Sequence, residues 1–282
     1  MTLAVLAACA ALACPRAEAW SGLGHQLVGE LAQRLLTPAA EAQVSQLLQG
    51  EPQPTLGGVA SWADWLRTTD PERFKATARW HYVNIAPGTC RYRARRDCPD
   101  GACVVGAIEA QQRLLVDASQ PLDVRRDALK FIVHFVGDVH QPLHSSNHSD
   151  QGANQFAIRL RTDIPPEEYA RDRYHDGVMD TNLHAVWDYY VLASAGLNPS
   201  AYAERLAAAL RPAARRQRSA ASWAAESCKS VRGLYPASHE LDGSYLAAMR
   251  PLAERRIVAA AERLAGLLNA AFPAADSSSN RP

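Results

Sequence analysis

The chain lacks an excess of charge of either sign, because 30 Lys and Arg residues against 29 Asp and Glu residues leave a formal net charge of +1. A protein that binds long duplex DNA by electrostatic attraction needs an extended basic surface. The balance therefore excludes a high-affinity DNA-binding protein of that kind. The basic residues are almost all arginine, and Arg93, Arg95 and Arg96 cluster in a segment that we interpret as a solvated loop.

The chain also lacks an apolar run long enough to cross a bilayer. Residues 3–14 are small and apolar, whereas a transmembrane helix needs about 20 such residues. The A-x-A pattern at 17–19 predicts a secretory signal over residues 1–19, whose removal exposes Trp20. The positively charged residues that usually begin a signal peptide are missing, so a true start upstream of Met1 stays an alternative. The Leu-Ala-Ala-Cys sequence at 6–9 leaves a lipoprotein signal as a second alternative. We expect a secreted or periplasmic protein.

No internal repeat or interior linker divides the chain, and the roughly 250 residues after the signal suffice for one domain with a real core. Helix-period apolar residues predict an all-α, single compact multi-helix domain over 20–273. The expected helices cover 23–36, 38–49, 58–69, 104–119, 122–140, 178–195, 199–218 and 243–270. Long loops are expected at 82–103 and 145–177, with one short strand at 156–160, and the tail 274–282 is expected to be disordered.

Residues 134–144 read HFVGDVHQPLH, which brings three histidines and an aspartate close together. His134 and Asp138 are four apart and share one face of a helix. Pro142 cannot continue that helix, so the chain should turn and bring His144 into the same pocket. Imidazole and carboxylate groups at such spacing are typical zinc ligands. The alternative is a polar helix end with scattered histidines.

A second pair with the same spacing, His184 and Asp188, lies among apolar residues. Alone, such a pair is equally well explained by a buried hydrogen bond. Two pairs in one chain favour metal binding. At the exposed terminus, the Trp20 amine and its carbonyl oxygen can form a chelate ring on a metal, with His25 close enough to add a bond.

Two further segments carry candidate ligands. Asp64 lies between tryptophans on a helical pattern, one turn from Arg67, and a buried carboxylate needs a partner. His81 lies between aromatic residues in a short extended segment. A satisfied core aspartate and a core histidine remain the alternatives, and for Arg67 the alternative is a surface salt bridge.

After removal of the signal, four cysteines remain, and an even number in an exported chain predicts two disulfides. Three pairings are possible among Cys90, Cys98, Cys103 and Cys228. Cys98 and Cys103 are close enough in sequence to close a small loop.

Together the motifs resemble those of the zinc-dependent type I nucleases, the secreted single-strand-specific nucleases of fungi, plants and bacteria. That family carries a W-x-x-x-G-H opening, a W-A-D segment, an isolated His, an H-x-x-x-D-x-H-Q-P-x-H run, a G-G-N-like loop and a late H-x-x-x-D. This chain has the counterparts in order, namely Trp20 with Gly24 and His25, Asp64, His81, 134–144, 152–154, and His184 with Asp188. The resemblance runs from Trp20 to at least residue 240, and Ser21 departs from the glycine of many members.

The resemblance implies a fold of the zinc phospholipase C/nuclease type with three zinc ions per chain. The first zinc would be held by Asp64, His81, His134 and Asp138. Its close neighbour would be held by the Trp20 amine and carbonyl, His25 and Asp138, which makes Asp138 a bridging carboxylate. The third would be held by His144, His184 and Asp188 and keep open positions for water. His140 is expected to orient or pack, and His148, His175 and His239 are expected at the surface. The family pairing would join Cys90 with Cys228.

The activity that this resemblance implies is hydrolysis of single-stranded DNA and RNA to 5′-phosphate products, together with 3′-nucleotidase activity. A zinc-bridged hydroxide would be the nucleophile, and the third zinc would stabilise the leaving 3′ oxygen. Asp64 and Asp138 would act as catalytic ligands, and Arg67 would steady the phosphate. No membrane association and no obligate protein partner are expected.

The residues that would bind a nucleobase are Tyr82, by stacking, and Asn154. Two departures from the family bear on it. Ala153 replaces the second glycine of the loop, where the backbone is then less free. Asn84 stands where fungal members carry a base-binding aspartate, and because an amide both donates and accepts, base preference stays open.

Two other functions remain open. A zinc phospholipase C uses a similar helical site on lipid phosphodiesters, but it should show an apolar rim without base-stacking residues. A non-enzymatic zinc-binding protein would hold zinc without phosphodiesterase activity.

Overall fold

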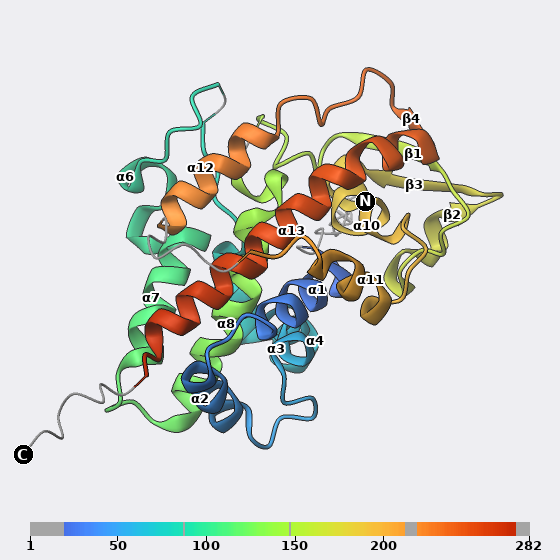
Figure 1. The fold of residues 1–282 in the computed structure, drawn as a ribbon. Coiled ribbons are helices and arrows are strands. Elements are labelled where there is room, and N and C mark those ends of the chain that lie inside the picture. Colours follow the sequence, from blue (N-terminus) through green and yellow to red (C-terminus); the bar gives the residue numbers. More distant parts are fainter. Residues whose placement is uncertain (1–19, 87, 147, 212–218, 275–282) are drawn as a thin grey trace, which may run out of the picture.

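The computed structural model describes residues 20–86, 88–146, 148–211 and 219–274. It is mainly helical, which confirms the predicted all-α class, with a small sheet at one side (Figure 1). The predicted signal peptide and all of the predicted tail but Ala274 lie outside the described residues.

The central element is helix α8 (Leu122–His140), whose second half is buried on every side. It contacts α1 (Gly22–Gln33), α7 (Val104–Val116) and α13 (Gly243–Ala271). Figure 1 shows α13 crossing the molecule as a long diagonal rod. Because the buried end of α8 is the end that carries the 134–144 motif, the fold brings this motif into the interior.

Two helices begin at a residue whose side chain caps the first turn. The Thr37 hydroxyl accepts from the Ala40 amide at the start of α2 (Pro38–Leu48), and the Asn198 side chain does the same for Ala201 in α11 (Pro199–Ala207). Pro at the first helical position suits such a start, because its missing amide proton is not needed there. The predicted extension of this helix to residue 218 is wrong over 208–211, and 212–218 lie outside the described residues.

Two further predicted helices differ from the structure. The segment 58–69 is divided into α3 (Leu56–Val59) and α4 (Trp62–Thr69). The prediction for 178–195 is wrong at its start, where β3 (Val178–Asn182) precedes a short helical run of α9 (Leu183–Ala185), a π-helical turn (Val186–Tyr190) and α10 (Val191–Ala193). The Asn182 side chain caps that run by accepting from the Ala185 amide.

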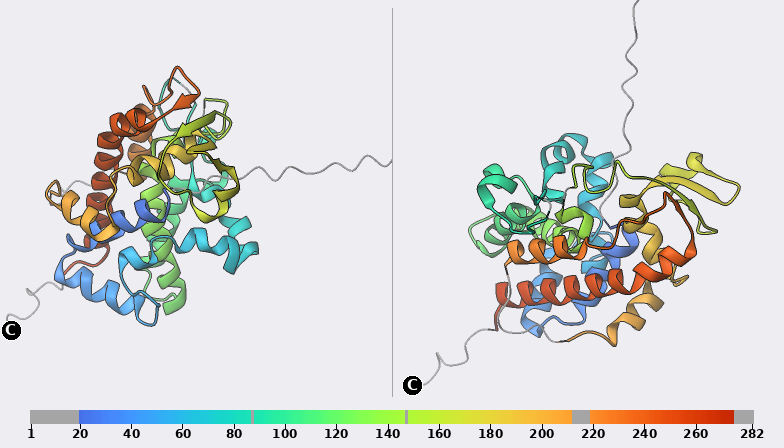
Figure 2. Two further views of the ribbon diagram at one scale, coloured as in Figure 1. Left: turned by 90° about the vertical axis from the view of Figure 1, so that its right-hand side faces the viewer. Right: turned by 90° about the horizontal axis from the view of Figure 1, so that it is seen from above.

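The sheet has the strand order β2-β3-β1-β4. β1 (Ala157–Arg161) pairs antiparallel with β3, in the register Ala157 to Asn182, and parallel with β4 (Glu240–Leu241). β2 (Tyr174–His175) pairs with β3. Only β1 was expected from the sequence, because β3 lies in a predicted helix, β2 in a predicted loop, and β4 in a segment for which no element was predicted. Figure 2 shows the sheet projecting from the helical body.

The remaining elements are short, apart from α12. They are α5 (Pro71–Thr77), the 3-10 helices η1 (Ala78–His81), η2 (Pro99–Gly101), η3 (Pro142–Ser145) and η4 (Glu168–Arg173), α6 (Ala94–Asp97) and α12 (Ala220–Ser230). None of the helices in the described part of the chain is long and apolar enough to cross a membrane.

Two disulfides cross-link the chain, Cys90–Cys228 and Cys98–Cys103. They are the pairs that the resemblance and the close spacing predicted. The first ties the segment after η1 to α12, and the second closes a small loop before α7. Disulfides fit an oxidising, extracellular compartment.

Candidate metal centre

Asp138 lies at the centre of a fully buried cluster at the end of α8. Its Oδ2 atom is 3.2 Å from His81 Nδ1 and 3.3 Å from His134 Nε2, and its Oδ1 atom is 3.4 Å from His25 Nε2. Neither oxygen has a hydrogen-bond partner among the described residues. The two oxygens thus face different histidines, as expected for a carboxylate that bridges two cations.

Asp64 reaches the same cluster from α4. Its Oδ1 atom lies 3.6 Å from His134 Nε2 and 3.7 Å from His81 Nδ1. Two groups with ligand atoms within 4.8 Å of one another could each hold a metal ion here. Their members are His25, Asp64 and His134 in one group, and His81, His134 and Asp138 in the other.

Trp20 is buried beside this cluster. Its indole nitrogen donates to the carbonyl oxygen of Gly137 at 3.1 Å, and the amide of Ser21 donates to the Asp188 carbonyl at 2.9 Å. His25 follows within α1 and stacks on His134, with ring centroids 3.8 Å apart. The start of the described chain therefore lies between the two predicted His–Asp pairs.

A second cluster lies where the chain turns after α8. As predicted from Pro142, the helix ends at His140 and the 3-10 helix η3 carries His144 inward. His144 Nε2 is 3.0 Å from His184 Nε2, which is 3.3 Å from Asp188 Oδ2. These three residues form a third group that could hold a metal ion.

Three of these histidines present a defined nitrogen to the cluster. In each, Nδ1 faces a backbone carbonyl oxygen, which can only accept, so in the neutral ring Nδ1 carries the proton and Nε2 keeps its lone pair. The pairs are His134 with Ala60 at 2.7 Å, His144 with His81 at 2.8 Å, and His184 with Gly152 at 2.5 Å. The backbone therefore selects the form of the ring that binds metals.

Burial keeps two of the imidazoles neutral. Desolvation, with a smaller contribution from His134, lowers the pKa of His25 to about 4. Desolvation and then His144 lower the pKa of His184 to about 3. Neutral imidazole is the form that coordinates a metal ion.

The carboxylates of the first cluster require positive charge beside them. Burial alone would raise the pKa of Asp138, but the histidines around it, His134 first, hold that pKa well below its usual range. Burial alone would lower the pKa of His134, but Asp138 and Asp64 outweigh it and raise that pKa to about 9. Buried oxygen and imidazole groups that face one another in this way fit zinc, which takes these ligands.

The predicted phosphate-binding residue, Arg67, lies one turn beyond Asp64 on α4. Its guanidinium carbon is 4.8 Å from the centre of the Phe74 ring, and that ring is 5.9 Å from the His81 ring. The arginine therefore lies beside the first cluster, on the same helix as one of its carboxylates.

The predicted base-binding residues come from two segments of the chain. Tyr82 directly follows His81, is 39% exposed, and alternates with Asn84 on the open side of an extended segment whose Val83 and Ile85 are buried. Asn154 lies in the loop after Gly152, whose carbonyl oxygen contacts His184, and lines a surface pocket of about 500 Å³ on β1 and β3. Ala153, the departure from the family pattern, takes a left-handed φ of 68°.

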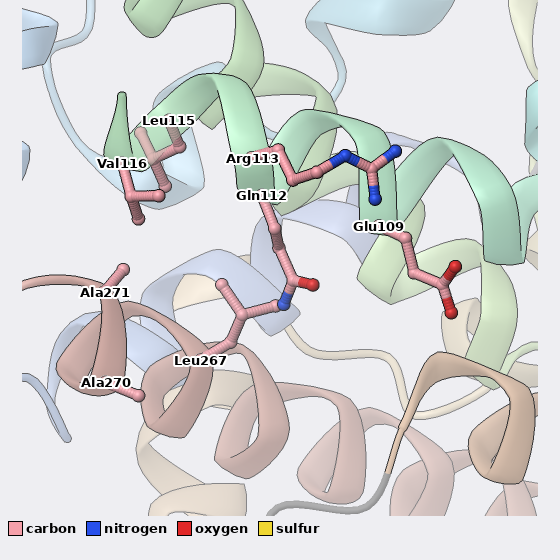
Figure 3. Close-up of a pocket in the computed structure, with 8 residues that line it drawn as sticks. All are labelled: Glu109, Gln112, Arg113, Leu115, Val116, Leu267, Ala270 and Ala271. Carbon is pink, nitrogen blue, oxygen red and sulfur yellow. The ribbon is translucent and has the colours of Figure 1, made fainter. Parts of the chain in front are cut away.

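A pocket of about 410 Å³ lies elsewhere, between α7 and the end of α13 (Figure 3). Its lining residues include none of the predicted site residues. The remaining histidines agree with expectation, because His140 is buried and bonded to the Val136 carbonyl, whereas His148, His175 and His239 are exposed.

The sequence did not indicate Gln141 as a site residue. It is fully buried, and its side-chain amide donates to Asp188 Oδ1 at 2.6 Å. The sequence shows that Gln141 lies at a helix end next to a proline. It does not show that Asp188 is its hydrogen-bond partner, because only the tertiary fold brings Asp188 there.

The fold and the three His–Asp groups define a helical protein with buried groups that could hold metal ions. The model of the S1/P1 nuclease family matches residues 20–273, and the chain belongs to this family. Endonuclease 2 of Arabidopsis thaliana is 31% identical over 193 residues, which cover 65% of this chain and 59% of the plant protein.

Two fungal relatives are similar to the same degree. Nuclease P1 of Penicillium citrinum is 31% identical over 175 residues, 61% of this chain and 58% of that protein. Nuclease S1 of Aspergillus oryzae is 30% identical over 172 residues, 60% of this chain and 53% of that protein. The chain thus spans little more than half the length of the curated relatives it matches.

Proposed function

We propose that the protein is a secreted, zinc-dependent endonuclease that hydrolyses phosphodiester bonds of single-stranded DNA and RNA to 5′-phosphate products and also acts as a 3′-nucleotidase. The observation that carries this proposal is Asp138, a buried carboxylate whose two oxygens face different histidines. Membership of a nuclease family supports it.

The proposed ligands provide for three zinc ions. They are Asp64, His81, His134 and Asp138 for one, the Trp20 amine and carbonyl, His25 and Asp138 for its neighbour, and His144, His184 and Asp188 for the third. Bound zinc supplies Lewis acidity, which lowers the pKa of water toward neutral and offsets the charge that builds up on phosphate oxygens. The Trp20 role requires a free amine, so a chain with one extra residue before Trp20 should hold one zinc fewer.

The chain's own residues bind and orient the substrate. Arg67 holds the scissile phosphate, because a guanidinium offers several fixed donors to phosphate oxygens. Its stacking on Phe74 limits where that group can move. Histidines that keep Nδ1 protonated against backbone carbonyls cannot rotate away without losing a buried hydrogen bond.

Selection of single strands follows from the exposed aromatic ring beside the first cluster. Tyr82 offers a face on which an unpaired base can stack, whereas the bases of a duplex already stack on each other. Asn154 can donate to and accept from the edge of that base. Asn84, on the same open side as Tyr82, can do likewise.

The test is digestion of single-stranded DNA, single-stranded RNA and duplex DNA of matched length, with 3′-AMP and phosphatidylcholine as further substrates. We expect soluble nucleotides with 5′-phosphate ends from the single strands, and free adenosine from 3′-AMP. Release of diacylglycerol without nucleotide release would identify a phospholipase C instead. Zinc binding without any hydrolysis would leave a non-enzymatic zinc protein.

A further inference from the structure

Gln141, the first residue after α8, lies between the two halves of the metal centre. Its side-chain amide nitrogen donates to Asp188 Oδ1 at 2.6 Å, and its side-chain oxygen accepts from the Leu143 amide at 2.6 Å. Its backbone amide donates to the Asp138 carbonyl at 3.0 Å, and its carbonyl accepts from the His144 amide at 3.1 Å. This residue therefore contacts three predicted ligands from two distant segments.

The Gln141 amide makes the two oxygens of Asp188 unequal. Oδ1 carries the hydrogen bond and is 3.9 Å from His144 Nε2. Oδ2 has no hydrogen-bond partner among the described residues and is 3.3 Å from His184 Nε2. One oxygen is occupied by a donor, and the other faces the histidine with its lone pairs available.

We propose that Gln141 is a positioning residue that presents Asp188 to the third metal ion through Oδ2 alone. The proposal deepens the proposed function and rests on its assignment of His144, His184 and Asp188 as ligands. An N–H group on Oδ1 competes with any cation for that oxygen, so the carboxylate is held as a one-oxygen ligand. Both ends of the amide are used, and among side chains of this length only an amide supplies a donor and an acceptor whatever the pH.

A purely structural role for Gln141 would use only its side-chain oxygen. The bond from the Leu143 amide to the Gln141 oxygen stabilises the turn that follows α8, whatever the amide nitrogen does. The two roles are separable because they belong to different atoms. The ionised carboxylate of Gln141→Glu keeps an acceptor for Leu143 and loses the donor to Asp188, whereas Gln141→Met has similar length and loses both.

The experiment measures zinc affinity by competition with a chromogenic chelator, without nucleic acid, on the mature chain. For both variants we expect one of three zinc ions to bind about 10- to 100-fold more weakly, the range found when an outer hydrogen-bond partner of a ligand is removed. The other two should keep the parent affinity. Gln111→Met is the matched control, because Gln111 is a buried glutamine on α7, outside the metal centre.

Three outcomes would overturn the proposal. The Gln141→Glu variant could bind all three zinc ions as tightly as the parent. Weakened binding could appear in Gln141→Met alone, which would assign the effect to the turn. The Gln111→Met control could lose the same zinc, which would indicate a general effect of core substitution. If Gln141→Met does not fold, Gln141→Glu alone decides.

Because no nuclease substrate is used, a parent that binds three zinc ions but cleaves nothing contradicts the proposed function and not this inference.

Discussion

At the scale of single residues, the position of Asp138 explains most of the arrangement of the candidate metal centre. It lies one helical turn after His134, and its two oxygens divide the surrounding histidines into two sets. A carboxylate buried without a hydrogen-bond donor costs free energy unless cations compensate it. The site is therefore arranged around a buried negative charge that the surrounding histidines stabilise and that metal ions can compensate.

Replacing Asp138 by Asn should remove activity. The amide keeps the size of the side chain but loses its charge and one metal-binding oxygen, so the two proposed zinc sites would lose a shared ligand. We expect hydrolysis of single-stranded DNA to fall by more than about 100-fold, beyond the range seen for outer partners of a ligand, and zinc content to fall.

The matched control for that change is Asp123→Asn, an exposed aspartate in the first turn of the same helix. It should keep zinc content and activity. An Asp138→Asn protein that digests single strands at the parent rate would contradict the assignment of this residue.

The site residues that could be predicted from the sequence are those whose signal is local. Two residues at i and i+4 share a helix face, so both His–Asp pairs could be recognised from spacing. The carbonyls that orient the rings could not, because Ala60 and Gly152 carry no side-chain signal. Gln141 is similar, since its partner Asp188 lies 47 positions away.

At the scale of elements, the close approach of α1 to α8 positions His25. A Cβ atom on Gly137 would lie 2.8 Å from His25 Nδ1, and one on Gly24 would lie 2.8 Å from Trp20 Cβ. Real Cβ atoms essentially never approach other atoms so closely. Both glycines therefore permit the packing that brings the start of the chain to Asp138.

Gly137→Ala should displace His25. We expect a loss of stability of about 1–3 kcal/mol, the usual cost of overpacking a core, together with weaker binding of the zinc assigned to His25. Urea unfolding and zinc titration measure the two effects.

Gly243→Ala is the control, because a Cβ atom at that helical glycine meets nothing within 4 Å. It should change neither stability nor zinc binding appreciably. If Gly137→Ala bound all zinc ions as the parent does, the packing of α1 on α8 would not determine the place of His25.

Long helices could be predicted from periodicity, with the exception of α12, which was not predicted, and the other errors fall on helix ends and on short or paired elements. Helix α8 has the predicted bounds, because a long run of apolar residues at helical spacing leaves little ambiguity. The segment Val178–Asn182 is a strand because it pairs with β1, which begins 21 residues earlier in the sequence. Its apolar pattern alone is compatible with either structure over so short a stretch.

At the scale of the whole molecule, the Cys90–Cys228 bridge closes a loop of 138 positions, whereas Cys98–Cys103 closes one of 5. In the chain-entropy model, a longer closed loop restricts the unfolded chain more. Removal by paired Cys→Ser changes should therefore cost about 5 kcal/mol for the long loop and about 2 kcal/mol for the short one.

Urea unfolding of the two double variants measures that difference. The long-range bridge also fixes the segment after His81 to α12, so its removal should lower activity more than removal of the short loop. Equal losses of stability in the two variants would contradict this account.

The central claim is that buried His–Asp groups hold three zinc ions that the reaction needs. The most direct measurement is zinc per chain in protein that begins at Trp20, followed by activity on single-stranded DNA in excess chelator and after zinc is restored. The account predicts three zinc ions, loss of activity with the chelator, and recovery with zinc. Protein that carries no metal and digests single strands at an undiminished rate in the chelator would contradict it.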